Sequence, residues 1–86
     1  MVSKVVTLKN ASGLHAKPAS ILAKKAAEFI SEINIEFNGK MANVKTLLGI
    51  LSLRIIKGGS VKVTASGPDE AAALEEVSKL IETISD

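Results

Sequence analysis

Apolar and polar residues alternate along three stretches of the chain, residues 2–8, 33–44 and 61–66. A period of two is the pattern of a β-strand that has one buried and one exposed face. The pattern therefore predicts strands here, with an inward-facing set that comprises Val6, Leu8, Val61, Val63 and Ala65.

The middle stretch contains Asn38-Gly39, a pair that favours the two-residue type I′ turn of a β-hairpin. Such a turn fixes the register of the two strands that it joins. The expected pairs are Phe37 with Lys40, Ile35 with Ala42, and Ile33 with Val44. Two of the three pairs are wholly apolar, which is consistent with a hairpin.

Between the strands, the apolar period changes to that of helices. A first helix is predicted from residue 16 to about residue 29, with an apolar face made of Ala19, Leu22, Ala23, Ala26 and Ile30. Thr46 and Asp69 are expected to cap a short second helix and a final helix, because their side chains accept hydrogen bonds from free amides. The stripe of the final helix consists of Leu74, Val77, Ile81 and Ile84, and it is flanked by Ala73 and Leu80.

These elements follow one another in the order βαββαβα, and 86 residues fit one domain over residues 1–86. The order predicts the α+β class, with a four-stranded, mainly antiparallel sheet and three helices packed on one face, an open-faced β-sandwich. Only 2% of the residues are aromatic, so the core is expected to be aliphatic.

Composition narrows the possible chemistry. The chain has no cysteine and one histidine, which excludes disulfides and thiolate chemistry and leaves no ordinary ligand set for zinc. We therefore expect neither a metal nor a cofactor. The first residues lack the apolar run of a secretion signal, and no stretch is long enough to span a membrane. The expected location is cytoplasmic, without membrane insertion.

A net charge of +2 is smaller than the clustered basic excess of most nucleic-acid-binding proteins. The predicted order of elements is also that of RNA-binding sheets, which stack bases on aromatic side chains. Phe37 is the only aromatic residue in any predicted strand. An RNA-binding module is thus a remote alternative, and no nucleic-acid partner is expected.

The segment Ser-Gly-Leu-His-Ala-Lys-Pro-Ala over residues 12–19 contains the only histidine of the chain, His15. It lies where a turn becomes the first helix, and Pro18 is tolerated there because the first amides of a helix have no acceptor within it. Those amides and the helix dipole attract an anion, and Lys17 adds a positive charge. A neutral imidazole in this position could accept a phosphoryl group. The spacing alone also fits a histidine that only caps the helix or lies inert on the surface, and it does not decide between these roles.

The same residues resemble the phosphohistidine motif Gly-(Leu/Ile)-His-Ala-Arg-Pro-Ala of the HPr family. HPr is the histidine-containing phosphocarrier of the bacterial phosphoenolpyruvate:sugar phosphotransferase system. The resemblance runs the full length of the chain, through the hairpin at residues 38–40, the segment 45–53 and the start of the last helix at residues 67–70.

The resemblance implies that His15 is phosphorylated on Nδ1 by enzyme I and passes the group to the IIA domain of a sugar permease. It implies that Pro18 shapes the start of the helix, and that Ser12 orients the ring or caps the turn. Such a chain is a carrier and not a stand-alone enzyme. A paralogue with a mainly regulatory or nitrogen-related signalling role is the alternative within the family.

Three residues depart from the family pattern. Lys17 replaces the arginine of the motif, which keeps the charge but loses the planar fork that fits phosphate oxygens. Thr46 occupies the position of a serine that HPr kinase/phosphorylase modifies in many Gram-positive relatives, so it is either a regulatory phosphorylation site or only a helix cap. Arg54 replaces a common glycine and either adds charge to a partner surface or adjusts the end of the short helix.

The short helix is too apolar to have only one buried side. Helical spacing groups Ile50 with Leu53, and it places Leu47, Leu48 and Leu51 on another side. One set must remain exposed, and an exposed aliphatic cluster on a small monomer indicates a partner-binding surface. We expect this surface to be Leu47, Leu48 and Leu51, framed by the positive charges of Lys17, Lys24 and Lys45.

Overall fold

The computed structural model describes residues 1–9 and 13–84, and the elements follow in the predicted order βαββαβα. They are β1 (Val2–Thr7), α1 (Ala16–Ala26), β2 (Glu32–Phe37), β3 (Lys40–Asn43), α2 (Leu47–Ser52), β4 (Ser60–Ser66) and α3 (Glu70–Thr83).

The four strands form one antiparallel sheet in the order β1-β4-β2-β3. The hairpin register is as predicted, with Phe37 opposite Lys40 and Ile35 opposite Ala42. The amide of Val44 donates to the carbonyl of Ile33 at 2.9 Å, which continues the same register. Asn38 and Gly39 both have positive φ, 53° and 77°, as a type I′ turn requires.

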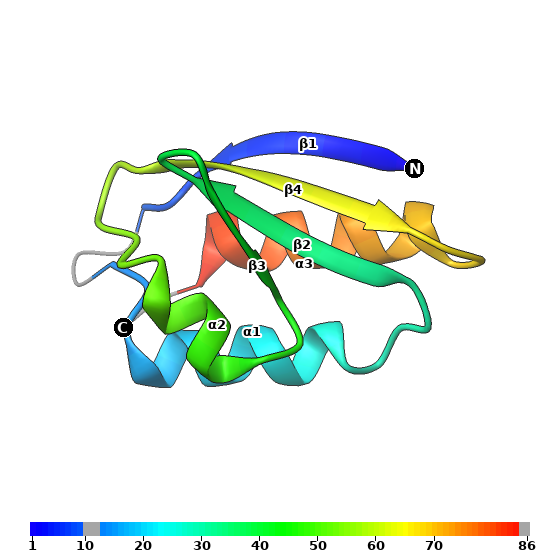
Figure 1. The fold of residues 1–86 in the computed structure, drawn as a ribbon, viewed down its shortest axis with the longest axis horizontal. Helices are drawn as coiled ribbons and strands as arrows, with labels where there is room; N and C mark the ends of the chain where they lie inside the picture. The colour runs from blue at the N-terminus through cyan, green and yellow to red at the C-terminus, as the bar shows by residue number, and fades with distance from the viewer. Residues whose placement is uncertain (10–12, 85–86) are drawn as a thin grey trace.

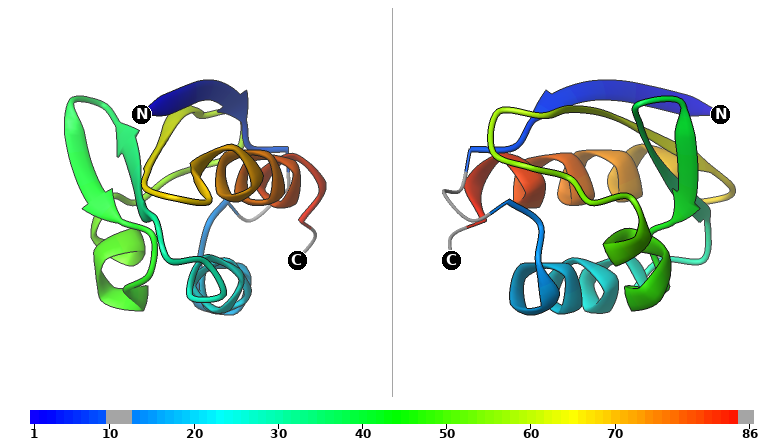
Figure 2. Two further views of the ribbon diagram at one scale, coloured as in Figure 1. Left: turned by 90° about the vertical axis from the view of Figure 1, so that its right-hand side faces the viewer. Right: turned by 60° about the vertical axis from the view of Figure 1, so that its left-hand side comes forward.

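The helices lie on one side of the sheet, which makes two layers (Figure 1). Helix α3 packs mainly against β1 and β4, whereas α1 packs against both α2 and α3. Figure 2 shows the short helix α2 below β3 and beside α1. The open-faced α+β architecture is therefore confirmed. In this arrangement the start of α1 and the whole of α2 lie near each other, toward the same end of the molecule (Figure 1).

The core between the layers is aliphatic, as predicted. All five residues expected on the inward faces of the first and last strands are buried, and Ala19, Leu22, Ala26 and Val77 meet them from the helices. The two phenylalanines only flank this core and are half-buried. Burial of branched aliphatic side chains is thus the main favourable term in the stability of this domain.

Helix α1 ends at Ala26, three residues before the predicted end. The amides of Glu28 and Phe29 donate to carbonyls three residues earlier, at 3.1 Å each, so the last turn tightens and the chain leaves the helix axis. Ile30 is consequently 78% exposed, and its predicted place on the buried face was wrong.

Thr46 and Asp69 occupy the positions just before α2 and α3, but neither side chain caps its helix. The hydroxyl of Thr46 donates to the carbonyl of Asn43 at 2.9 Å. The carboxylate of Asp69 accepts from the backbone amides of Ile30 and Ser31, at 2.9 Å each, and from the hydroxyl of Ser31. Both cap predictions were wrong because these side chains bind other segments.

The Asp69 cluster predicts a pH-dependent part of the stability. The Ser31 hydroxyl and the Ile30 amide lower the pKa of Asp69 from 3.8 to about 2. A carboxyl group whose pKa is depressed by folding stabilises the protein above its unfolded pKa, and this contribution disappears as the pH falls toward 2. We expect Asp69→Asn to lower the Tm at neutral pH by roughly 5–10 °C. The Tm of this variant should also decrease less than the Tm of the wild type when the pH is lowered from about 4 to about 2.

Thermal melts followed by circular dichroism from pH 7 to pH 2 would test this expectation. The matched control is Glu75→Gln, which removes an exposed carboxylate of α3 that has no ion pair within residues 1–9 and 13–84. Equal melting temperatures for Asp69→Asn and the control at pH 7 would contradict the role of the cluster.

Candidate functional site

The backbone just before α1 is held by the segment that follows α2. The amide of Leu14 donates to the carbonyl of Ile55 at 2.9 Å, and the Leu14 side chain is buried. Gly13 has φ 72°, and a Cβ atom built there would lie 2.6 Å from the same carbonyl oxygen. Only glycine fits this close approach, which fixes the path of the chain into His15.

His15 is the residue immediately before α1, with φ −93° and ψ −168°. Its side chain is exposed and does not cap the helix. Its backbone carbonyl accepts the hydrogen bond from the amide of Ala19, at 2.9 Å. The structure therefore argues against the simple capping interpretation and leaves an imidazole accessible to another protein.

The start of α1 is electrically suited to an anion. Its first turn contains no acidic residue, and its first amides, of Ala16 and Lys17, have no acceptor within the helix. Pro18 is buried at the third helical position, where its missing amide costs no helical hydrogen bond. The Lys17 side chain is exposed in the same turn. The positive end of the helix thus lies beside His15, and Lys17 adds a positive charge to the same turn.

Ser12 and Lys24 were also predicted to belong to the site. Ser12 lies outside the described residues. Lys24 is exposed on α1, seven positions after Lys17, so that helical spacing places both lysines on one face. Between them, Ile21 is 42% exposed on the same face. Ile21 was not among the predicted surface residues, although its position four residues after Lys17, on an otherwise charged face, was a usable signal.

Helix α2 divides its apolar residues as expected. Ile50 and Leu53 are buried, whereas Leu47 is 38% and Leu48 is 80% exposed. Leu51 is half-buried against the core and contributes less to the surface than predicted. Because α2 packs beside α1, these exposed residues and Ile21 belong to adjacent helices. We call Ile21, Leu47, Leu48 and the exposed part of Leu51 the α1–α2 patch.

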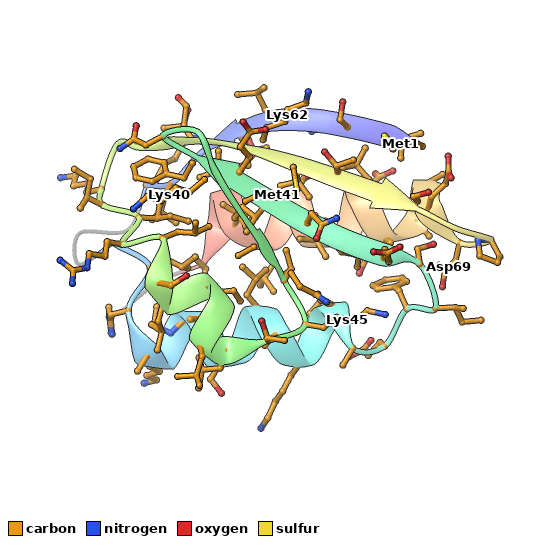
Figure 3. All side chains as sticks on the ribbon, viewed as in Figure 1. Met1, Lys40, Met41, Lys45, Lys62 and Asp69 are labelled. Carbon is orange, nitrogen blue, oxygen red and sulfur yellow. The ribbon has the colours of Figure 1, made fainter. Side chains whose placement is uncertain are left out.

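The Lys45 side chain is hydrogen-bonded to the backbone, and its ammonium group keeps its positive charge. Its ammonium group donates to the carbonyl of Phe29 at 2.7 Å and ties the start of α2 to the end of α1 (Figure 3). Thr46 follows it and is exposed. The exposed lysines beside the α1–α2 patch are Lys17 and Lys24 on α1, and the half-buried Lys45 adds a positive charge next to the start of α2.

Other kinds of site receive no support from the described residues. Within residues 1–9 and 13–84, no group of three or more histidine, aspartate or glutamate side chains could hold a metal ion. In the same part of the chain, no helix is long and apolar enough to cross a membrane. An open groove of about 470 Å³ lies between β1 and α3, but none of the predicted site residues lines it.

Comparison with known proteins bears on this site directly. A family model described as the PTS HPr component phosphorylation site matches residues 2–83. The chain is 38% identical to the phosphocarrier protein HPr of Buchnera aphidicola subsp. Baizongia pistaciae, over 98% of this chain and 99% of that protein.

Two solved structures agree closely with the fold. HPr from Bacillus anthracis str. Ames has a TM-score of 0.91 at 36% identity, with 94% of this chain and 96% of that one covered. HPr-C-His from Thermoanaerobacter tengcongensis has a TM-score of 0.90 at 38% identity, with 94% and 91% covered. Another solved structure from that organism is described as an HPr dimer. From the family match and the full-length relative together, the chain belongs to the HPr phosphocarrier family of the phosphotransferase system.

Proposed function

We propose that this chain accepts a phosphoryl group on His15 from enzyme I of the phosphotransferase system and passes it to the IIA domains of sugar permeases, in the cytoplasm. The observation that carries the proposal is the exposed imidazole of His15 at the start of α1, within the family's motif. The α1–α2 patch with Lys17 and Lys24 supplies an apolar, positively charged surface for both partners.

In the proposed step, an unprotonated ring nitrogen of His15 attacks the phosphorus atom carried by a histidine of enzyme I. The new N–P bond forms while the N–P bond of the donor breaks, and the electron pair of that bond returns to the donor ring. The other nitrogen of His15 keeps its proton, so the step requires no general base. The first amides of α1 and the ammonium group of Lys17 stabilise the charged phosphoryl oxygens.

Transfer onward is the same reaction in reverse, with His15 as the donor and a histidine of the IIA domain as the acceptor. The chain therefore ends each cycle unchanged in composition but turns over no substrate by itself. A carrier of this kind must leave its partners quickly, which suits a small interface of modest affinity and a monomeric chain.

The proposal predicts that the purified chain gains one phosphoryl group when it is mixed with enzyme I and phosphoenolpyruvate. The product should be labile in acid and stable in base, as a phosphohistidine is, and the label should leave the chain when a IIA domain is added. Intact mass and phosphorus NMR would measure both steps. A chain that stays unlabelled with an enzyme I active on another HPr would overturn the proposal.

The receiver distinguishes the main alternative within the family. A paralogue with a regulatory or nitrogen-related role would take the group from a different enzyme I homologue or deliver it to a different receiver. Competition between sugar-permease IIA domains and nitrogen-related receivers for the labelled chain would separate the two roles. Size-exclusion chromatography with light scattering would determine whether the carrier is a monomer.

Thr46 is the proposed position of a second, regulatory phosphorylation, with a purely structural role as the alternative. Its exposure favours access by a kinase, and its bond to the Asn43 carbonyl favours the structural role. Thr46 directly precedes Leu47 in the sequence, so a phosphate there would add negative charge beside the α1–α2 patch. Incubation with HPr kinase/phosphorylase and ATP, followed by intact mass, would decide between these roles.

A further inference from the structure

Arg54 has a backbone conformation that arginine does not favour. It follows Leu53 at the end of α2 with φ 51°, in the left-handed region where glycine is unstrained. Within the described part of the chain, the other non-glycine residue with positive φ is Asn38, whose turn requires it. Retaining a disfavoured residue at such a position is a reason to look for a function of its side chain.

The backbone places Arg54 next to the candidate site. Ile55, the residue after Arg54, accepts the hydrogen bond from the amide of Leu14, the residue before His15. Arg54 is therefore the chain neighbour of one hydrogen-bonded residue and His15 is the chain neighbour of the other. Neighbouring Cα atoms are about 3.8 Å apart, so both residues lie close to this hydrogen bond. In Figures 1 and 2, the segment leaving α2 runs beside the segment that enters α1. A long arginine side chain can reach the imidazole from there.

The charge of Arg54 is also uncommitted. The residue is exposed, and its guanidinium forms no ion pair with the residues that the structure describes. Lys17, the one cation in the first turn of α1, is a point charge. It cannot donate two parallel hydrogen bonds to two phosphate oxygens, as a planar guanidinium can.

We propose that Arg54 is a phosphoryl-binding residue, whose guanidinium donates paired hydrogen bonds to the phosphoryl oxygens while the group moves onto and off His15. The inference rests on the proposed phosphocarrier function and adds a second cation to its site. Lys17 supplies charge from α1, and Arg54 supplies the bidentate fork from the end of α2.

Kinetics of transfer from enzyme I would test the proposal with Arg54→Gln, which removes the charge and the fork. The matched control is Lys57→Gln, which removes an exposed positive charge three residues further along the same segment. We expect Arg54→Gln to lower kcat roughly tenfold with little change in KM, because the bond is formed to the group in transfer. The control should transfer at the wild-type rate, and adding Lys17→Arg to Arg54→Gln should restore much of the loss.

Chemical labelling provides a second readout that does not depend on enzyme I. Potassium phosphoramidate would phosphorylate His15 in wild type and both variants, and phosphorus NMR would compare their phosphohistidine signals. A shift in Arg54→Gln that is absent from Lys57→Gln supports direct contact. Arg54→Gly should transfer as slowly as Arg54→Gln and yet have a higher Tm than wild type, which separates lost chemistry from lost folding.

The inference is overturned if Arg54→Gln matches Lys57→Gln both in kcat and in its phosphorus signal. If enzyme I labels no variant, including wild type, the proposed function fails. The chemically labelled samples then still decide whether Arg54 contacts a phosphoryl group on His15.

Discussion

Replacing His15 with alanine is expected to abolish labelling by enzyme I and phosphoenolpyruvate while the domain stays folded. No other residue in the chain is a histidine, so no second imidazole can accept the group. The side chain is exposed and caps nothing, and its loss should therefore cost less than about 1 kcal/mol of stability. Intact mass after the labelling reaction, together with a thermal melt, would measure both effects.

A second variant tests whether the loss of labelling is due to the missing imidazole. His15→Gln keeps a polar side chain of similar size at the start of α1 but offers no ring nitrogen, and it should also remain unlabelled. The control is Lys57→Gln, which alters an exposed position and should be labelled fully. A buried position such as Ser78 would be unsuitable, because a substitution there could disturb the fold. Phosphate found on the His15→Ala chain at the wild-type rate would refute the assignment of the carrier residue.

Leu47→Glu is expected to raise the KM for transfer from enzyme I roughly tenfold or more, with the fold intact. Leu47 is partly exposed at the start of α2, so a polar replacement buries no charge in the core. The glutamate removes apolar contact area and adds negative charge to a surface whose rim carries Lys17 and Lys24, which disfavours an acidic partner. Steady-state transfer kinetics at low and high salt would measure the effect.

Val5→Glu is the matched control for this substitution. Val5 is 65% exposed on β1, at a strand position whose side chain points away from the helical layer. It makes the same chemical change on a different surface, so transfer should proceed as in wild type. The α1–α2 patch would be rejected if the two variants gave the same KM, whether normal or raised.

Much of the fold could be predicted because local patterns determine it. The alternation at Val61 and Val63 and the turn at Asn38-Gly39 define strands and register without knowledge of the rest of the chain. The errors have a different origin. Asp69 was expected to cap its own helix, but it binds the amides at residues 30 and 31, which are distant in sequence. Periodicity carries no information about such partners.

The candidate site could be predicted only where its residues form a motif. His15, Lys17 and Pro18 are close together in the sequence, and the structure places them together at the start of α1. The place of Arg54 beside the segment entering His15 follows from the hydrogen bond between residues 14 and 55. That contact joins two loops, and nothing in either loop's local pattern indicates it.

The Asp69 cluster also has an evolutionary consequence. The longest dimension of the molecule is 33 Å, and Asp69 lies at the opposite end from the start of α1 (Figures 1 and 3). Substitutions at well-separated positions have nearly additive effects on stability. A lineage adapting to heat or acidity could therefore adjust the anchor around Asp69 while the start of α1 at the far end of the molecule stayed unchanged.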